Sequence, residues 1–185
     1  MKRWILISIA GRDRPGIVAS LSRALYQNRA QIEDLSHAVV QGQFAMILIA
    51  SLGNPEAGQL QNDLAGLAED LDLHIHIKKI SQQDLVPVQS GETEVFFLTI
   101  QGEDHPGLVY GISELLAERG INITNLKALR AFPELQLDYL QVFEVDIPKG
   151  VNLDLVREKL EKRGKEMGVK VDLHPRKTFR TIHPE

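Results

Sequence analysis

The chain has 185 residues, 43% hydrophobic and 25% charged, which is typical of globular proteins and sufficient for two cores of about 80 to 90 residues each. Its net charge of −4, with no cluster of cations on one face, argues against direct nucleic-acid binding. The absence of cysteine excludes disulfides and thiolate metal sites and permits a reducing cytoplasm, where we expect the protein to act. No apolar run approaches the roughly 18 residues that cross a bilayer, so no membrane partner is expected.

Six elements are predicted in the first half of the chain from its hydrophobic periodicity. They are a strand at 4–10, a helix at 15–28 with Pro15 at its first position, strands at 31–40 and 44–50, a helix that begins at Glu56, and a strand at 73–78. The strand at 44–50 is apolar on both faces, which predicts cover on both sides.

The second half repeats the first. Residues 7–18 and 98–109 both read as a strand, a glycine turn and a proline-started helix. The matched pairs, at a constant offset of 102 − 11 = 91 residues, are Gly11 with Gly102, Asp13 with Asp104, Pro15 with Pro106, and Gly16 with Gly107. An offset of this size indicates two copies of one small domain.

The elements expected in the second copy are strands at 95–101, 122–131, 137–147 and 169–173 and helices at 106–119 and 153–167. The order β-α-β-β-α-β predicts an α+β fold, a ferredoxin-like domain with an antiparallel four-stranded sheet and two helices on one face. We therefore expect domains at 1–80 and 95–174, a linker at 81–94 that contains Pro87 and Gly91, and a polar tail at 175–185.

The repeated loop has the chemistry of a small binding site. A glycine turn before a helix presents unpaired N–H groups at the positive end of the helix dipole, and Gly16 and Gly107 have no Cβ to block an anion. Asp13 and Asp104 lie beside this point and can pair with an ammonium group, which makes an α-amino-acid site the functional hypothesis. In the structural alternative, each aspartate satisfies the helix start with its own side chain.

Other kinds of site have less support. The spacing of a dinucleotide-binding loop is absent, and no catalytic spacing of Ser, His and Asp or of paired carboxylates repeats in both copies, so we expect neither an enzyme nor a cofactor. His74 and His76 project from one face of a strand but have no third ligand nearby in the sequence, so no metal is expected. His105, where the first copy has Arg14, either tunes a bound carboxylate or is simply exposed.

The motifs Asp-Arg-Pro-Gly-Ile-Val at 13–18 and Asp-His-Pro-Gly-Leu-Val at 104–109 resemble those of the ACT domain, the regulatory module of amino-acid metabolism. Two tandem copies without an attached enzyme are similar to the glycine cleavage system transcriptional repressor family. The resemblance covers all but the linker and the tail. It implies that the sheets associate edge to edge or face to face, with a homodimer expected, and that amino acids bind where domains meet.

The resemblance also implies which residues bind the ligand, namely the loop and the start of the next strand. On this chain these are Gly11, Asp13, Pro15, Gly16, Ile17 and Gln31, then Gly102, Asp104, Pro106, Gly107, Leu108 and Asn122. Asn122 has the amide that is common at this point, whereas Gln31 is one methylene longer.

The expected function is that of a non-enzymatic regulator that binds a small amino acid, with glycine or serine favoured. It would act through a protein partner, such as a transcription regulator. The alternative is a purely structural interaction protein, in which the loops bind nothing and the strand at 44–50 drives oligomerisation.

Overall fold

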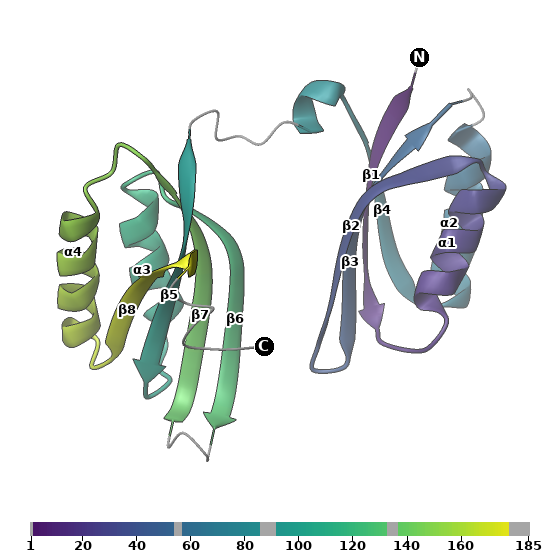
Figure 1. The fold of residues 1–185 in the computed structure, drawn as a ribbon. Coiled ribbons are helices and arrows are strands. Elements are labelled where there is room, and N and C mark those ends of the chain that lie inside the picture. The colour runs from purple at the N-terminus through teal and green to yellow at the C-terminus, as the bar shows by residue number, and fades with distance from the viewer. Residues whose placement is uncertain (1, 54–56, 86–91, 133–136, 178–185) are drawn as a thin grey trace. The chain divides into compact units, whose positions relative to one another are not determined.

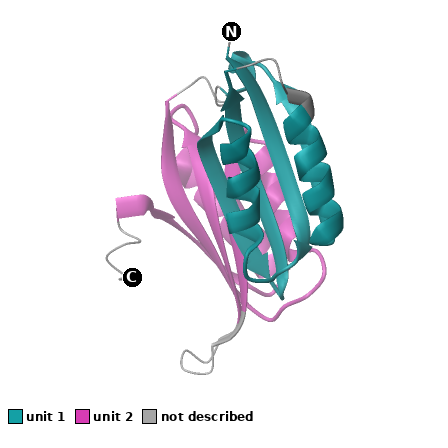
Figure 2. Ribbon diagram, turned by 90° about the vertical axis from the view of Figure 1, so that its right-hand side faces the viewer, with its two compact units in different colours: residues 1–88 teal, residues 89–185 magenta. Residues whose placement is uncertain are grey.

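The computed structural model describes residues 2–53, 57–85, 92–132 and 137–177. The chain divides into two compact units, residues 1–88 and 89–185 (Figure 2). Residues 86–91 of the predicted linker and 178–185 of the predicted tail lie outside the described residues.

The first unit has the predicted element order (Figure 1). Its elements are β1 (Arg3–Arg12), α1 (Ile17–Gln27), β2 (Ala30–Val40), β3 (Gln43–Leu52), α2 (Ala57–Asp70) and β4 (Leu73–Ile80), followed by the 3-10 helix η1 (Gln82–Leu85). The strands form one antiparallel sheet in the order β2-β3-β1-β4.

The second unit repeats this arrangement. Its elements are β5 (Thr93–Gly102), α3 (Leu108–Ala117), β6 (Asn122–Phe132), β7 (Leu137–Pro148), α4 (Leu153–Glu166) and β8 (Lys170–Pro175). Its antiparallel sheet has the equivalent order β6-β7-β5-β8. The predicted α+β class and tandem ferredoxin-like architecture are confirmed.

Each unit has its own core between the sheet and its two helices. Ile5, Ile7 and Ile9 alternate along β1 toward the helices and are at most 5% exposed, where they pack in one cluster with Leu21 of α1 and Leu64 of α2. The same alternation buries Phe96, Leu98 and Ile100 of β5 in the second core. None of the described helices is both long and apolar enough to cross a membrane.

The helices that follow the repeated loops, α1 and α3, begin two residues later than the sequence predicts. Gly16 and Gly107 adopt φ values of 97° and 98° and stand before α1 and α3, which begin at Ile17 and Leu108. A left-handed residue cannot continue a right-handed helix. Each proline therefore lies in a turn with its glycine, in the positions that a type II turn favours, and not at the first helical position.

Strand β3 has one covered face. Phe44, Met46 and Leu48 are buried in the first core, whereas Ile47, which points to the opposite face, is 55% exposed. The helices of the first unit thus cover only one of the two apolar faces.

Both units have a bulge at the same place in an edge strand. The pairing register shifts between Ile32 and Asp34 in β2 and between Ile123 and Asn125 in β6. The extra residue in β2 is Glu33, whose Oε1 accepts a hydrogen bond of 2.5 Å from Ser51 Oγ. The bulge therefore turns the first residues of each edge strand relative to the rest.

Candidate functional site

The loop of the first unit leaves the start of α1 open. The backbone N–H of Asp13 donates to the carbonyl of Gly42 at 2.9 Å, which holds the loop to the β2–β3 turn. The first helical hydrogen bond runs from the N–H of Ser20 to the carbonyl of Gly16, also at 2.9 Å, so the preceding N–H groups have no partner within the helix. A Cβ added to Gly16 would meet no described atom within 4 Å outside its chain neighbours.

The second unit has the same geometry at α3. The N–H of Gly111 donates to the carbonyl of Gly107 at 2.8 Å, and a Cβ on Gly107 would likewise meet nothing within 4 Å. Both glycines are exposed. Among the described residues, the N–H groups at the start of the helix have no backbone partner in either unit, as an anion site requires.

The aspartates lie exposed beside these helix starts. Among the described residues, the carboxylate of Asp13 receives no hydrogen bond, and the residue directly before α1 is Gly16. The capping by aspartate that the structural alternative requires is thus not formed at α1. At α1, the exposed carboxylate of Asp13 next to open N–H groups has the arrangement that a small zwitterion would need.

The second loop differs from the first at His105. Its Nε2 lies 2.8 Å from the carbonyl oxygen of Met167 and its Nδ1 lies 3.1 Å from that of Pro106. These two carbonyls, Met167 first, raise the pKa of His105, and the nearby Asp104 adds to the effect. The imidazole thus holds the loop to the end of α4, a role that neither sequence interpretation had given it.

The predicted site residues divide into two groups that lie far apart within a unit. Gln31 pairs with Ser51, which pairs with Trp4, whereas the loop begins at Gly11, seven residues further along β1. At about 3.3 Å per residue the separation is roughly 23 Å. The structure therefore brings the loop residues together and leaves Gln31 at the opposite end of the sheet.

Asn122 has the same position in the second unit, because it pairs with Asp146, which pairs with Val95, again seven residues before Gly102. Ile17 and Leu108 are each 2% exposed. Their side chains thus belong to the cores, and only their backbone groups are open to a ligand.

A buried polar pair near the second loop was not anticipated. Gln141 is 1% exposed and donates from Nε2 to Tyr139 Oη at 2.7 Å, while its Oε1 has no partner among the described residues. Tyr139 pairs with Gly102, where the loop begins. The equivalent residues of the first unit are Phe44 and Met46, opposite Gly11 and Ile9, so this polar pair is a property of the second unit alone.

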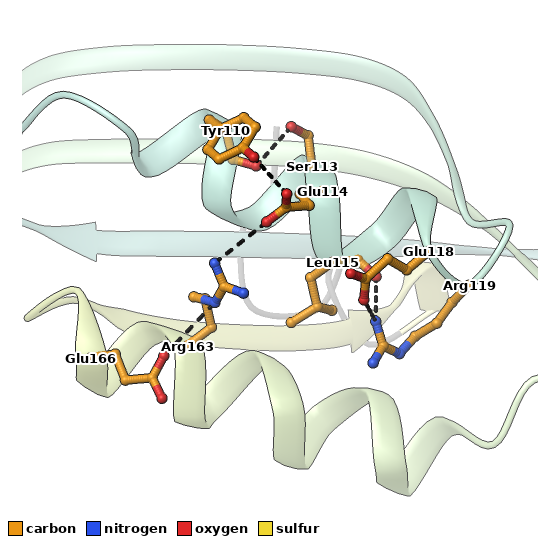
Figure 3. A network of polar contacts seen from close by, with 8 residues as sticks. All are labelled: Tyr110, Ser113, Glu114, Leu115, Glu118, Arg119, Arg163 and Glu166. Atoms are coloured by element: carbon orange, nitrogen blue, oxygen red, sulfur yellow. Dashed lines mark hydrogen bonds and ion pairs between the residues drawn. The ribbon is translucent and has the colours of Figure 1, made fainter.

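The first turn of α3 is also linked to α4 (Figure 3). Tyr110 Oη donates to Glu114 at 2.5 Å, and Arg163 lies 3.8 Å from both Glu114 and Glu166. The hydrogen bond to Glu114 raises the pKa of Tyr110. Such exposed ion pairs contribute little individually, but this network joins the helix start at Gly107 to the neighbouring helix.

The histidines of β4 are isolated. His74 and His76 are exposed, and no group of three or more His, Cys, Asp or Glu side chains that could hold a metal occurs in the part of the chain that the structure describes.

Comparison with known proteins identifies the module. A model of the ACT domain matches residues 3–78 and 94–174. A UPF0237 protein of Methanopyrus kandleri is 33% identical over 75 residues, which are 40% of this chain and 83% of that protein. An unknown protein from Galdieria sulphuraria has a solved structure that is 28% identical, with a TM-score of 0.76 over 95% of this chain and 99% of that one.

A crystal structure described as "putative glycine cleavage system transcriptional repressor" shares the fold. It is 20% identical, with a TM-score of 0.67, and the likeness covers 94% of this chain and 97% of that one. The two segments that match the ACT model correspond to the two units described above. The chain therefore belongs to the ACT domain family, with two ACT domains in tandem.

Proposed function

We propose that this chain is a non-enzymatic regulator that binds glycine or serine through its repeated loops and acts by contact with another protein. The observation that carries the proposal is the open helix start, with Gly16 and Gly107 in the left-handed conformation and an aspartate three residues earlier in each loop. The N–H groups and the helix dipole would receive the carboxylate of the ligand. The aspartate would receive its ammonium group.

The complete site lies at an interface between ACT domains. Within one unit the loop and the residues Gln31 or Asn122 are roughly 23 Å apart, so one small ligand cannot reach both. An edge strand of a second ACT domain, from this chain or another copy, supplies the missing amide. Binding then favours one assembly over another, which is how a ligand changes the contact with a partner.

Calorimetry with the full chain and the proteinogenic amino acids tests the proposal. We expect heat from glycine or serine and none from glycolate or methylamine, each of which lacks one of the two charges. Asp104→Asn should weaken binding by about tenfold or more, because it removes a charge-assisted hydrogen bond. Glu103→Gln, at the neighbouring exposed position, is the matched control and should bind as the wild type. No heat from any amino acid would contradict the proposal.

We propose that the protein whose contact depends on ligand binding is, for example, a transcription regulator. The net charge of −4 disfavours a direct contact with nucleic acid. Affinity capture with the full chain, with and without glycine, should recover a partner whose yield depends on the ligand. A yield that is independent of ligand would argue against regulation by the amino acid.

A purely structural interaction protein is the second candidate. The exposed apolar side chains of the first unit favour it, since Val40 is 64% and Ile47 is 55% exposed. Calorimetry and light scattering on Asp104→Asn together separate the candidates. Loss of amino-acid binding with an unchanged oligomeric state supports the regulator. If Ile47→Ser dissociates the oligomer and no amino acid binds to the wild type, the interaction protein is the better description.

A further inference from the structure

The face of β4 that points away from the helices carries two histidines side by side. His74 and His76 are separated by one residue, so both side chains project from the same face of the strand, with their Cα atoms roughly 6.6 Å apart. Ile75, between them, packs against the first core on the opposite face. Both histidines are exposed, and no hydrogen bond or ion pair engages either imidazole within the described residues. Both rings are therefore available to an added ligand.

The neighbouring strand leaves space in front of this pair. His74 pairs with Ala10 and His76 pairs with Ser8, both small residues, and a hollow of about 620 Å³ lies over this part of the sheet. No described Lys, Arg, Asp or Glu lines the hollow. A cation bound to the imidazoles, together with the waters that complete its coordination, thus has room and meets no repelling charge there.

The second unit has a different pair at the equivalent positions. Lys170 and Asp172 of β8 stand where β4 has His74 and His76, because the β5 residues with which they pair match those of β1 at the common offset of 91 residues. Nζ of Lys170 lies 2.8 Å from Oδ2 of Asp172. Side chains at these two positions can therefore meet above the sheet. In the first unit the same positions hold two imidazole rings in place of an ion pair.

We propose that His74 and His76 chelate a divalent transition-metal ion, with Cu²⁺ bound most tightly. Imidazole nitrogen is a ligand that suits Cu²⁺, Ni²⁺ and Zn²⁺, and Cu²⁺ has the highest affinity of the three. A third protein ligand, whose lack makes a metal unexpected from the sequence, is not needed, because water can complete a tetragonal Cu²⁺ site. The positions left to water make this site open, unlike the closed four-ligand sites that hold structural zinc. It includes none of the residues proposed to bind the amino acid.

Pulsed electron paramagnetic resonance of bound Cu²⁺ tests the chelate directly, because it reports how many imidazole rings coordinate the ion. One equivalent of Cu²⁺ added to the full chain, in a buffer without amino acids or other chelators, should give a spectrum with two rings. Calorimetry under the same conditions should show saturable binding. An excess of Mg²⁺ should not displace Cu²⁺, because Mg²⁺ prefers oxygen ligands.

Three histidine variants, whose folding circular dichroism checks, separate this pair from the other histidines. His74→Gln and His76→Gln should each weaken Cu²⁺ binding about tenfold or more and leave at most one ring in the spectrum, because the second ligand of a chelate binds at a high effective concentration. His37→Gln is the matched control and should change neither result. His37 is also an exposed strand residue, but it pairs with the buried Met46 and stacks on Phe44, so its ring lies on the face of the sheet that the helices cover.

Three results would overturn the proposal. They are a single ring in the wild-type spectrum, an unchanged affinity in His74→Gln or His76→Gln, and equal losses of affinity in His37→Gln and His76→Gln.

Discussion

His105 and Met167 are joined across 62 residues of the second unit, with Nε2 of the imidazole 2.8 Å from the main-chain carbonyl oxygen. Because Nδ1 faces the carbonyl of Pro106, only the protonated imidazole, with two N–H groups, can donate to both oxygens. A neutral His105 can donate to only one of the two carbonyls, so deprotonation removes one of these two hydrogen bonds.

This relationship predicts a pH dependence. The pKa of His105 is raised in the folded protein, so its stabilising contribution is complete below the ordinary histidine pKa of about 6.5 and is lost as the pH rises through the raised value. His105→Gln should therefore lower the free energy of unfolding more at about pH 5.5 than at about pH 8.5. Urea unfolding at the two pH values measures the difference, with His76→Gln, exposed on β4, as the control. A larger loss at the higher pH would contradict the assignment.

Gly164→Ala should destabilise the second unit. A Cβ at this position in α4 would lie 2.8 Å from the carbonyl oxygen of Val169 and 2.7 Å from Val171 Cγ2, and the backbone oxygen cannot simply move away. Overpacking of this kind costs about 1–3 kcal/mol. Gly66→Ala in α2 is the control, since a Cβ there meets nothing within 4 Å and should stabilise the helix by roughly 0.5–1 kcal/mol. Urea unfolding of the two variants should therefore show shifts of opposite sign.

Gly107→Ala should cost about 1–2 kcal/mol although space is free around the glycine, because the cost arises from φ at 98° and not from a clash. Gly107→Asn should cost less, since asparagine tolerates the left-handed region better. Thermal unfolding of the two variants gives the order. Equal losses would show that the glycine serves another purpose.

The buried pair Tyr139 and Gln141 predicts a non-additive double mutant. Gln141→Met alone leaves the Tyr139 hydroxyl without its described partner and should cost about 1 kcal/mol. Tyr139→Phe combined with Gln141→Met recreates the Phe44 and Met46 pair of the first unit and removes the unpartnered Oε1. Denaturant unfolding should show the double variant at least as stable as the wild type. A double variant as unstable as the single one would show that the polar pair has a structural role.

The fold could be predicted because the evidence for it is local and repeated. Stripes of apolar residues in both halves, with Asp13 and Asp104 at one offset, indicate the element order without any knowledge of pairing. The helix starts differ from the prediction because Pro15 and Gly16 form a turn together, which outweighs the preference of proline for the first helical position.

The site was harder to predict because it depends on pairing between distant residues. The loop at Gly11 and the strand start at Gln31 are close in sequence, but α1 returns the chain to the opposite end of the sheet. Gln141 was missed because the hairpin before it is longer in the second copy, so Phe44 matches Tyr139 at 139 − 44 = 95 and not at the common offset of 91. Only the register of the sheets reveals such equivalences.

The bulge shared by β2 and β6 has a consequence for solubility. Within each unit, no described strand pairs with the outer side of β2 or β6, and an unpaired strand edge is the usual template for fibril growth. The extra residue near the start of the strand, Glu33 in β2 and Thr124 in β6, breaks the even spacing of those groups. A flat intruding strand would match the backbone groups on one side of the bulge and not those on the other, so the bulge disfavours aggregation along this edge.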